Sequence, residues 1–305
     1  MAPRVKCLGK DSILDRSVDG YIRSLTHRLV LKSASATMPK NDLHYLGLCE
    51  VANLIGSKEV SSIEVTKAQL DRISELNPEL GAYVLVMHDS ALRQAEAADK
   101  ALAKGKPLGP LHGVPVAVKD LFWTKAVCTE AGMTLSKGFK PSENATVVDR
   151  LVASGAVLLG KLKTTEGAYA DHHPSVSAPL NPWNKDYWSG VSSSGSGVAT
   201  AGGLCYGALG TDTGGSIRLP TAANGLTGVK PTWGRVSRHG VFELAATLDH
   251  VGPMTRSAED AAAILQVIAG ADPRDPTASH SPVADYRAAA AAGLRGMRIG
   301  VDSAW

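Results

Sequence analysis

From residue 41 onward, segments in which hydrophobic residues recur at helical spacing alternate with short continuous apolar runs. Apolar residues at helical spacing between 46 and 55 predict a helix that stops at Gly56. The segment Ser61–Glu64 has the form of a capping box, so a second helix is expected to begin there and to end before Asn77-Pro78. An alanine-rich run from 90 to 104, followed by Gly105, predicts a third helix.

Short apolar runs between the helical segments predict strands at 83–87, 114–118, 156–159 and 297–301. Further helices are expected at 145–153, 258–269 and 284–292. The stretch 171–190 contains three prolines and no periodicity, which is typical of a loop. Helices that alternate with short buried strands predict an α/β domain with a mixed, largely parallel central sheet flanked by helices.

The two ends of the chain carry separate expectations. Residues 1–38 contain scattered basic residues without a compact apolar core, and we expect a poorly ordered N-terminal extension. Residues 39–305 are expected to form the α/β domain. A strand at 297–301 would have no crossover after it, which predicts a domain that is C-terminally truncated.

Composition excludes several classes of protein. The formal charge of +3 is spread over the chain and aromatic residues make up 5%, so neither a basic stripe nor a stacking surface for nucleic acid is expected. No apolar run is long enough to span a membrane. The cysteines show no metal-binding or CxxC spacing, which favours reduced thiols and a cytoplasmic protein (Cys7, Cys49, Cys128 and Cys205).

Two tracts rich in glycine and serine are candidates for chemistry. Gly190–Gly197 lacks both the lysine of a phosphate-binding loop and the final glycine of a GxSxG nucleophile elbow. In Thr213–Ser216, two glycines allow several backbone N–H groups to turn toward one point beside a serine, as an oxyanion requires. A helix is expected to begin near Ile217. A flexible turn is the alternative interpretation of such a tract.

Lys119 follows the apolar run 114–118. A lysine in this position is most often a solvated strand end. If the core desolvates it, its pKa falls and the neutral amine can accept a proton. The residues alone leave both interpretations open.

Four motifs in one order give the chain a resemblance to a known family: Leu111–Asp120, the serine tract at 192–197, Gly210–Arg218 and Gly228–Thr232. Over roughly Asn41 to Val301, the chain resembles the amidase signature family. The resemblance implies an amidase-signature fold and an amide hydrolase with a Ser-Ser-Lys triad. In this triad Ser216 matches the nucleophile, Ser192 the bridging serine, which in the family lies on a cis peptide, and Lys119 the base.

The resemblance also implies the surroundings of the triad. The backbone N–H groups of Thr213, Gly214, Gly215 and Ser216 match the oxyanion hole, and Asp212 and Arg218 match charged residues that brace the nucleophile loop. The substrate is expected to be a small-molecule carboxylic amide rather than a peptide bond. No cofactor, metal, nucleic acid or membrane is expected to take part, and a homodimer is an open alternative to a monomer.

The tract around Ser192 departs from the family pattern, and this bears on two alternative functions. The family usually has Gly-Gly-Ser-Ser-Gly-Gly around the bridging serine, whereas Gly190–Gly195 reads Gly-Val-Ser-Ser-Ser-Gly. The serine pair is retained, but the change argues against the second hypothesis, a glutaminase like the amidase-type subunit of the glutamyl/aspartyl-tRNA amidotransferases. A third hypothesis, of another class, is an inactive fragment.

Other candidate residues are interpreted as structural. His172 and His173 lack neighbouring acidic residues or cysteines, so they are expected on a loop surface rather than at a metal. Trp183 and Trp188 precede Ser192 and would either line the pocket or, more commonly, fill gaps beneath the loop.

Overall fold

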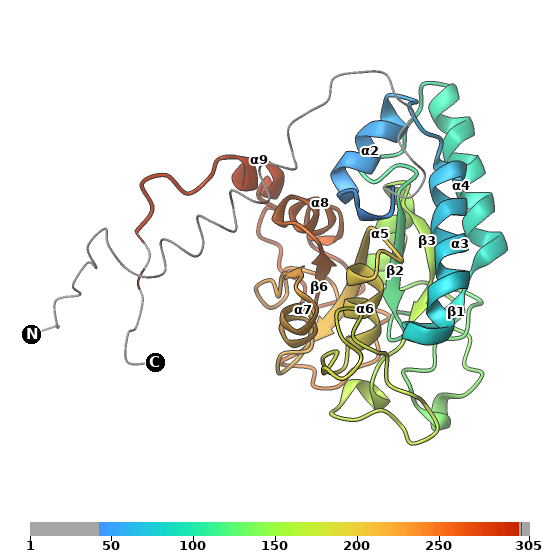
Figure 1. Cartoon of the computed structure of the whole chain (residues 1–305). Coiled ribbons are helices and arrows are strands. Elements are labelled where there is room, and N and C mark those ends of the chain that lie inside the picture. Colours follow the sequence, from blue (N-terminus) through green and yellow to red (C-terminus); the bar gives the residue numbers. More distant parts are fainter. Residues whose placement is uncertain (1–42, 299, 301–305) are drawn as a thin grey trace, which may run out of the picture. The chain divides into compact units, whose positions relative to one another are not determined.

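The computed structural model describes residues 43–298 and 300, which form one sheet flanked by helices (Figure 1). The strands are β1 (Tyr83–Val86), β2 (Pro115–Lys119), β3 (Val157–Leu162), β4 (Gly207–Asp212), β5 (Thr227–Gly228) and β6 (His250–Thr255). The α-helices are α2 (Leu48–Gly56), α3 (Ser62–Leu80), α4 (His88–Ala103), α5 (Thr146–Ala153), α6 (Ser194–Ala201), α7 (Arg218–Asn224), α8 (Ala258–Ile268) and α9 (Tyr286–Ala291). Short 3-10 turns lie at Leu43–Tyr45, Thr134–Ser136 and Glu166–Ala168.

The sheet has the strand order β1-β3-β2-β4-β6-β5. β3, β2 and β4 are parallel, whereas β1, β6 and β5 pair with their neighbours in the antiparallel sense. The predicted mixed sheet is therefore confirmed, with its parallel part confined to the three central strands. Because parallel strands end at the same edge, the last residues of β2 and β4 (Lys119 and Asp212) come out on one side of the sheet.

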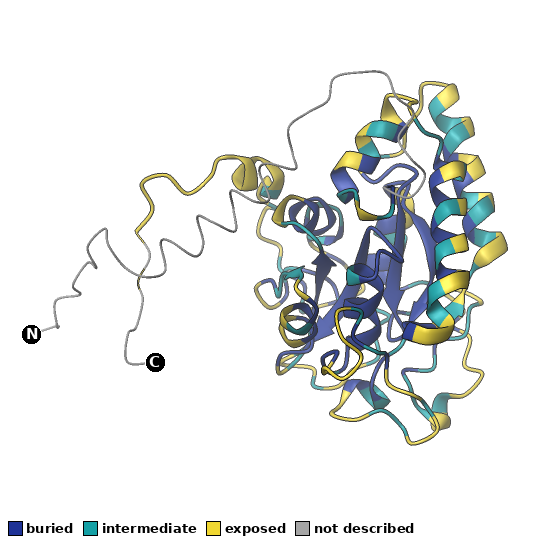
Figure 2. Ribbon diagram, viewed as in Figure 1, coloured by how far each residue is buried: buried dark blue, intermediate teal, exposed yellow. Residues whose placement is uncertain are grey.

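The central strands are buried (Figure 2), and alternation along them divides the core between the two faces of the sheet. Val116 and Val118 belong to a core that includes residues of α2, α5 and α8. Ala117 belongs to the other core, which includes residues of α3, α4 and α6. Continuing this alternation, Lys119 is directed toward the face that α6 covers.

The end of α3 differs from the prediction. The capping box is present, since the Ser61 hydroxyl accepts the N–H of Glu64 and the Glu64 carboxylate accepts that of Ser61. However, the helix continues through Pro78 to Leu80 instead of ending before Asn77. The extra turn buries Leu80 in the core, and Gly81 then ends the helix in a left-handed conformation with φ of 63°.

The predicted strands at 83–87, 114–118 and 156–159 correspond to β1, β2 and β3, and β3 runs three residues further. Of the predicted strand 297–301, residues 297, 298 and 300 are not in a strand, and the others lie outside the described residues. The expectation for residues 1–38 also concerns residues that the structure does not describe. Among the residues described, no helix is long and apolar enough to cross a membrane.

Candidate active site

Lys119 ends β2 with its side chain fully buried. Its Nζ donates hydrogen bonds to the Ser192 Oγ at 2.6 Å and to the Thr211 Oγ1 at 2.8 Å. Both partners are neutral hydroxyls, and among the described residues no carboxylate forms an ion pair with this amine. The structure therefore decides between the two interpretations of Lys119 in favour of the desolvated lysine.

Burial lowers the pKa of Lys119 well below the ordinary lysine value. The negative charges of Asp249 and Asp212 oppose this shift without cancelling it. The lowered pKa favours the neutral amine, whose lone pair can accept a proton while its N–H groups bond to neighbouring hydroxyls. Thr211 is such a neighbour, and sequence reasoning did not identify it.

Ser192 lies two residues before α6, next to the N-cap Ser193, in a left-handed conformation with φ of 61°. Such a conformation is uncommon for a residue other than glycine. The cis peptide that the resemblance implied at this serine is not found, since the described residues contain only trans peptide bonds. Two further serines of the tract bond to β4: Ser193 donates to the carbonyl of Thr211 at 3.2 Å, and Ser196 to that of Leu209 at 3.0 Å. The tract thus fixes the start of α6 against the strand that leads to the second tract.

Ser216 lies in the loop between β4 and α7, with 8% of its surface exposed. Its hydroxyl takes part in none of the hydrogen bonds found among the described residues. The structure thus joins Lys119 to Ser192 directly, and it places Ser216 on the adjoining loop without a bond between the two serine hydroxyls. The predicted beginning of a helix near Ile217 is confirmed, because α7 starts at Arg218.

Asp212 organises this loop from the end of β4. Its buried carboxylate accepts the N–H of Gly215 at 2.8 Å, of Ile217 at 3.2 Å and of Arg218 at 3.3 Å. The Arg218 side chain adds two bonds of 3.0 Å. Burial alone would raise the pKa of Asp212, but these hydrogen bonds and the Arg218 charge hold it below its usual value. The carboxylate is therefore ionised and holds the loop in place.

The bond from Gly215 to Asp212 changes the set of backbone donors available to a substrate. Because its N–H already points at the carboxylate, Gly215 is not a free donor in this structure. The N–H groups of Thr213, Gly214 and Ser216 have no hydrogen-bond partner among the described residues. These three remain the candidates for an oxyanion hole.

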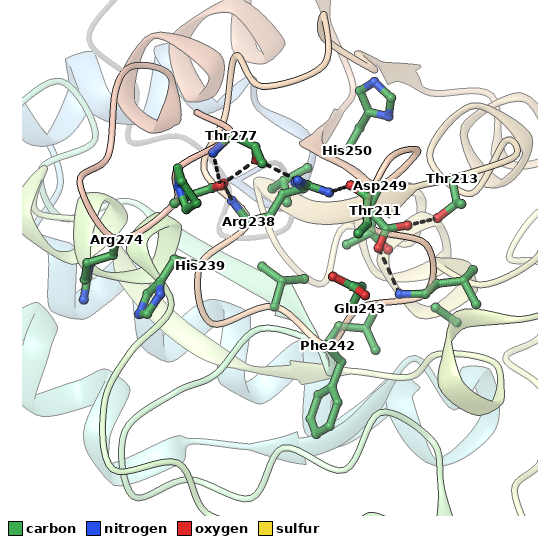
Figure 3. A pocket seen from close by; sticks show the side chains of 18 residues that line it. Thr211, Thr213, Arg238, His239, Phe242, Glu243, Asp249, His250, Arg274 and Thr277 are labelled. Carbon is green, nitrogen blue, oxygen red and sulfur yellow. Dashed lines mark hydrogen bonds between the residues drawn. The ribbon is translucent and has the colours of Figure 1, made fainter. Parts of the chain in front are cut away.

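A cavity of about 260 Å³ adjoins the site (Figure 3). Thr211 and Thr213 form part of its wall, so it begins beside the hydroxyl that holds Lys119. Asp249, just before β6, accepts the Thr213 hydroxyl at 2.5 Å and the backbone N–H groups of Leu244 and Ala245 at 2.9 and 3.0 Å. Sequence reasoning did not identify Asp249, because only the fold brings it next to Thr213.

The remaining candidates have structural surroundings. His172 contacts the Ser194 Oγ at 3.2 Å, and His173 bonds to Ser175 in its own loop. No group of three or more His, Cys, Asp or Glu residues in the described part of the chain could hold a metal ion. Trp183 and Trp188 are 73% and 58% exposed, so the interpretation that they fill gaps beneath the loop is wrong.

The Amidase family profile matches residues 64–304. The chain belongs to the amidase family. A Mycobacterium tuberculosis protein provisionally named amidase AmiD is 56% identical over 271 residues, which are 88% of this chain and 57% of that protein. A glutamyl-tRNA(Gln) amidotransferase subunit of Anaeromyxobacter dehalogenans is 48% identical over 269 residues, 88% of this chain and 55% of that protein.

Solved structures agree with the family assignment. The native peptide amidase of Stenotrophomonas maltophilia superposes with a TM-score of 0.76 at 36% identity, over 82% of this chain and 53% of that enzyme. This amidase-family chain thus spans about half the length of the curated relatives it matches. The match shows the amidase-signature fold of its described part.

Proposed function

We propose that this amidase-family chain hydrolyses carboxylic amides to the acid and ammonia or an amine, through an acyl-enzyme at Ser216. The main support is the 2.6 Å contact between the fully buried Lys119 amine and the Ser192 hydroxyl. A neutral lysine in contact with one serine, beside a loop that carries a second, is the arrangement of a Ser-Lys nucleophile system.

In the proposed first half-reaction, Lys119 accepts the proton of the Ser192 hydroxyl, which takes the proton of Ser216. The Ser216 Oγ attacks the amide carbon, and the backbone N–H groups of Thr213, Gly214 and Ser216 would hold the oxyanion. As the C–N bond breaks, the proton returns through Ser192 to the leaving nitrogen. This step is needed because an amide anion is a very poor leaving group.

In the second half-reaction, water attacks the acyl ester by the same route. Lys119 and Ser192 take the proton of the water, and Ser216 leaves with a proton returned to its oxygen. Asp212 and Arg218 have a positioning role, because they hold the loop rather than the reacting atoms. The proposed cycle needs neither a metal nor an organic cofactor.

A fluorophosphonate probe tests this proposal, since it captures an activated serine without a matched substrate. We expect stoichiometric labelling that mass spectrometry maps to Ser216 and that is lost in Ser216→Ala and Lys119→Met. Ser142→Ala is a matched control, because Ser142 is exposed and bonds to none of the described residues. Labelling that persists in Ser216→Ala would refute the assignment, and no labelling of the folded wild type would support the inactive fragment.

The likeness to the amidotransferase subunit supports a second candidate, a glutaminase that works with a partner protein. Ammonia release from a panel of small amides, compared with release from glutamine, separates the two functions. We expect hydrolysis of small amides by the chain without a partner.

We also propose a cytoplasmic protein that engages neither nucleic acid nor membrane. The described cysteines (Cys49, Cys128 and Cys205) are free thiols, as in a reducing compartment.

A further inference from the structure

The cavity beside Thr211 has walls that are apolar over much of their area. Leu121, Ala168, Val241, Phe242 and Val251 all line it. A volume of about 260 Å³ is enough for a small acyl chain and too small for a folded partner. Since the cavity shares Thr211 and Thr213 with the proposed active site, a chain bound in it would extend away from that site.

The two arginines that line the cavity are already bound by other residues of the protein. Arg274 lies 3.2–3.8 Å from the carboxylates of Glu143, Asp149 and Asp272. Arg238 donates to the Thr277 hydroxyl at 2.6 Å and to the carbonyl of Ala246. These arginines are therefore occupied, which argues against an anionic group on the substrate.

Two of the three acidic side chains that line the cavity are also engaged. Asp249 accepts three hydrogen bonds from the loops around it. Asp275 accepts the N–H of Arg238 at 2.7 Å and both the N–H and the hydroxyl of Thr277. Glu243 differs from both, because its carboxylate has no hydrogen bond or ion pair with any residue that the structure describes.

Figure 3 shows the Glu243 carboxylate between Phe242 and the Thr211–Asp249 end of the cavity. The backbone that follows it is held by the N–H of Leu244, which bonds to Asp249 at 2.9 Å, while the Glu243 side chain itself is exposed. A free carboxylate above an aromatic ring and beside apolar walls is a suitable site for an ammonium group on an apolar stem.

We propose that this cavity is a subsite for the acyl part of the substrate and that Glu243 binds an ammonium group there. The substrate would be an amide of a carboxylic acid that carries an amine on an apolar chain. This inference rests on the proposed amidase function, which supplies the reason for an acyl chain to enter the cavity. Glu243 thereby selects the substrate without taking part in the proton transfers.

The test compares ε-aminocaproamide with heptanamide, its neutral isostere in which a methyl replaces the ammonium group. We expect the wild type to favour ε-aminocaproamide in kcat/KM by roughly tenfold at low salt, a size typical of one partly exposed charge pair. Added salt should reduce the preference, because the pair is not fully desolvated. Glu243→Gln should abolish the preference, and it should lower kcat/KM for ε-aminocaproamide more than it changes kcat/KM for heptanamide.

Glu75→Gln on α3 is the matched control and should keep the preference, since it removes one exposed carboxylate that does not line the cavity. Binding of both amides to Ser216→Ala, measured by calorimetry, repeats the comparison without turnover. Equal affinities there, or a preference that survives Glu243→Gln, would overturn the role of Glu243. Absence of turnover and of Ser216 labelling would instead refute the amidase function, whereas the binding comparison would still decide the ammonium subsite.

Discussion

Lys119 and Lys161 are both fully buried, on the neighbouring strands β2 and β3. Substitution by methionine should mainly lower activity at Lys119 and mainly lower stability at Lys161. Methionine has a similar length and no charge. We expect Lys161→Met to destabilise the fold strongly and to lower activity only to the extent that the protein unfolds. We expect Lys119→Met to leave the fold nearly intact and to abolish labelling of Ser216.

The magnitude for Lys161 follows from its partners. Its Nζ lies 3.3 Å from the buried carboxylate of Asp120 and donates to the Thr129 hydroxyl at 2.8 Å and to the carbonyl of Phe122. Removing the amine leaves Asp120 as a buried charge without its cation, which costs about 3–5 kcal/mol of unfolding free energy. Burial raises the pKa of Asp120 despite Lys161 and lowers that of Lys161 to about 8. The charged pair therefore exists between these two pKa values, and the loss of stability should be largest near neutral pH and smaller at acidic pH, where Asp120 is protonated.

The magnitude for Lys119 is smaller because its partners are hydroxyls. Lys119→Met removes two neutral hydrogen bonds, each worth about 1 kcal/mol. It also removes the cost of burying an amine, so we expect a net change within about 1–2 kcal/mol.

The pH dependence of stability gives a second readout for Lys119. Its pKa in the folded state lies below the 10.5 of the unfolded chain. Between these two pKa values the unfolded chain binds more protons, and the wild type gains stability as pH rises through that window. Lys119→Met should lack this gain.

Equilibrium unfolding in urea, followed by circular dichroism, measures both changes, and fluorophosphonate labelling under native conditions measures activity. Adding Asp120→Asn to Lys161→Met should recover part of the lost stability, because it neutralises the carboxylate left behind. The reasoning fails if Lys119→Met costs as much stability as Lys161→Met, or if Asp120→Asn recovers nothing.

Three further predictions concern the loops around the site. Asp249→Asn should shift the acid limb of the labelling rate to lower pH, because the Asp249 charge favours the ammonium form of Lys119; an unchanged pH profile would contradict this. Asp212→Asn should slow labelling by about tenfold or more, since it weakens the bonds that hold the loop of Ser216, and a rate equal to wild type would remove its positioning role. Gly195→Ala should lower the urea midpoint, because a Cβ there would lie 2.5–2.7 Å from backbone atoms, whereas Gly214→Ala, where a Cβ meets open space, should leave it unchanged.

Helix α6 shows why part of the site could not be predicted from the sequence. Its sequence, Ser-Gly-Ser-Gly-Val-Ala-Thr-Ala, has two glycines in its first turn and low helical propensity. The helix is favoured by packing instead. At Gly195 and Gly197 a Cβ would approach Lys163 N at 2.5 Å and Asn224 Nδ2 at 2.7 Å, so only glycine allows this close approach. Helix propensity is a local property and does not include these contacts with residues distant in the sequence.

Strands β4, β5 and β6 were also not predicted as strands. β6 has the sequence His-Val-Gly-Pro-Met-Thr, in which glycine and proline disfavour a strand, although Pro253 is accommodated opposite Leu209. In contrast, the apolar run before Lys119 predicted β2 to within one residue, because its five residues are all buried and the hydrophobic pattern is local. Local patterns were therefore sufficient for the centre of the sheet and insufficient for its antiparallel edge.

The polar residues around Lys119 explain how the proposed lysine base can have a lowered pKa beside two carboxylates. A bare carboxylate at contact distance would favour the ammonium form, as Asp120 does for Lys161, whose pKa burial still lowers to about 8. Near Lys119, the charge of Asp212 is balanced by Arg218 and that of Asp249 is spread over three donors. Each carboxylate therefore holds a loop while its field at the amine is weakened, and the hydroxyls of Ser192 and Thr211 are the groups in contact with Nζ. On this argument, burial is the main cause of the lowered pKa of Lys119, and the arginine and backbone partners of the two carboxylates allow that effect to prevail.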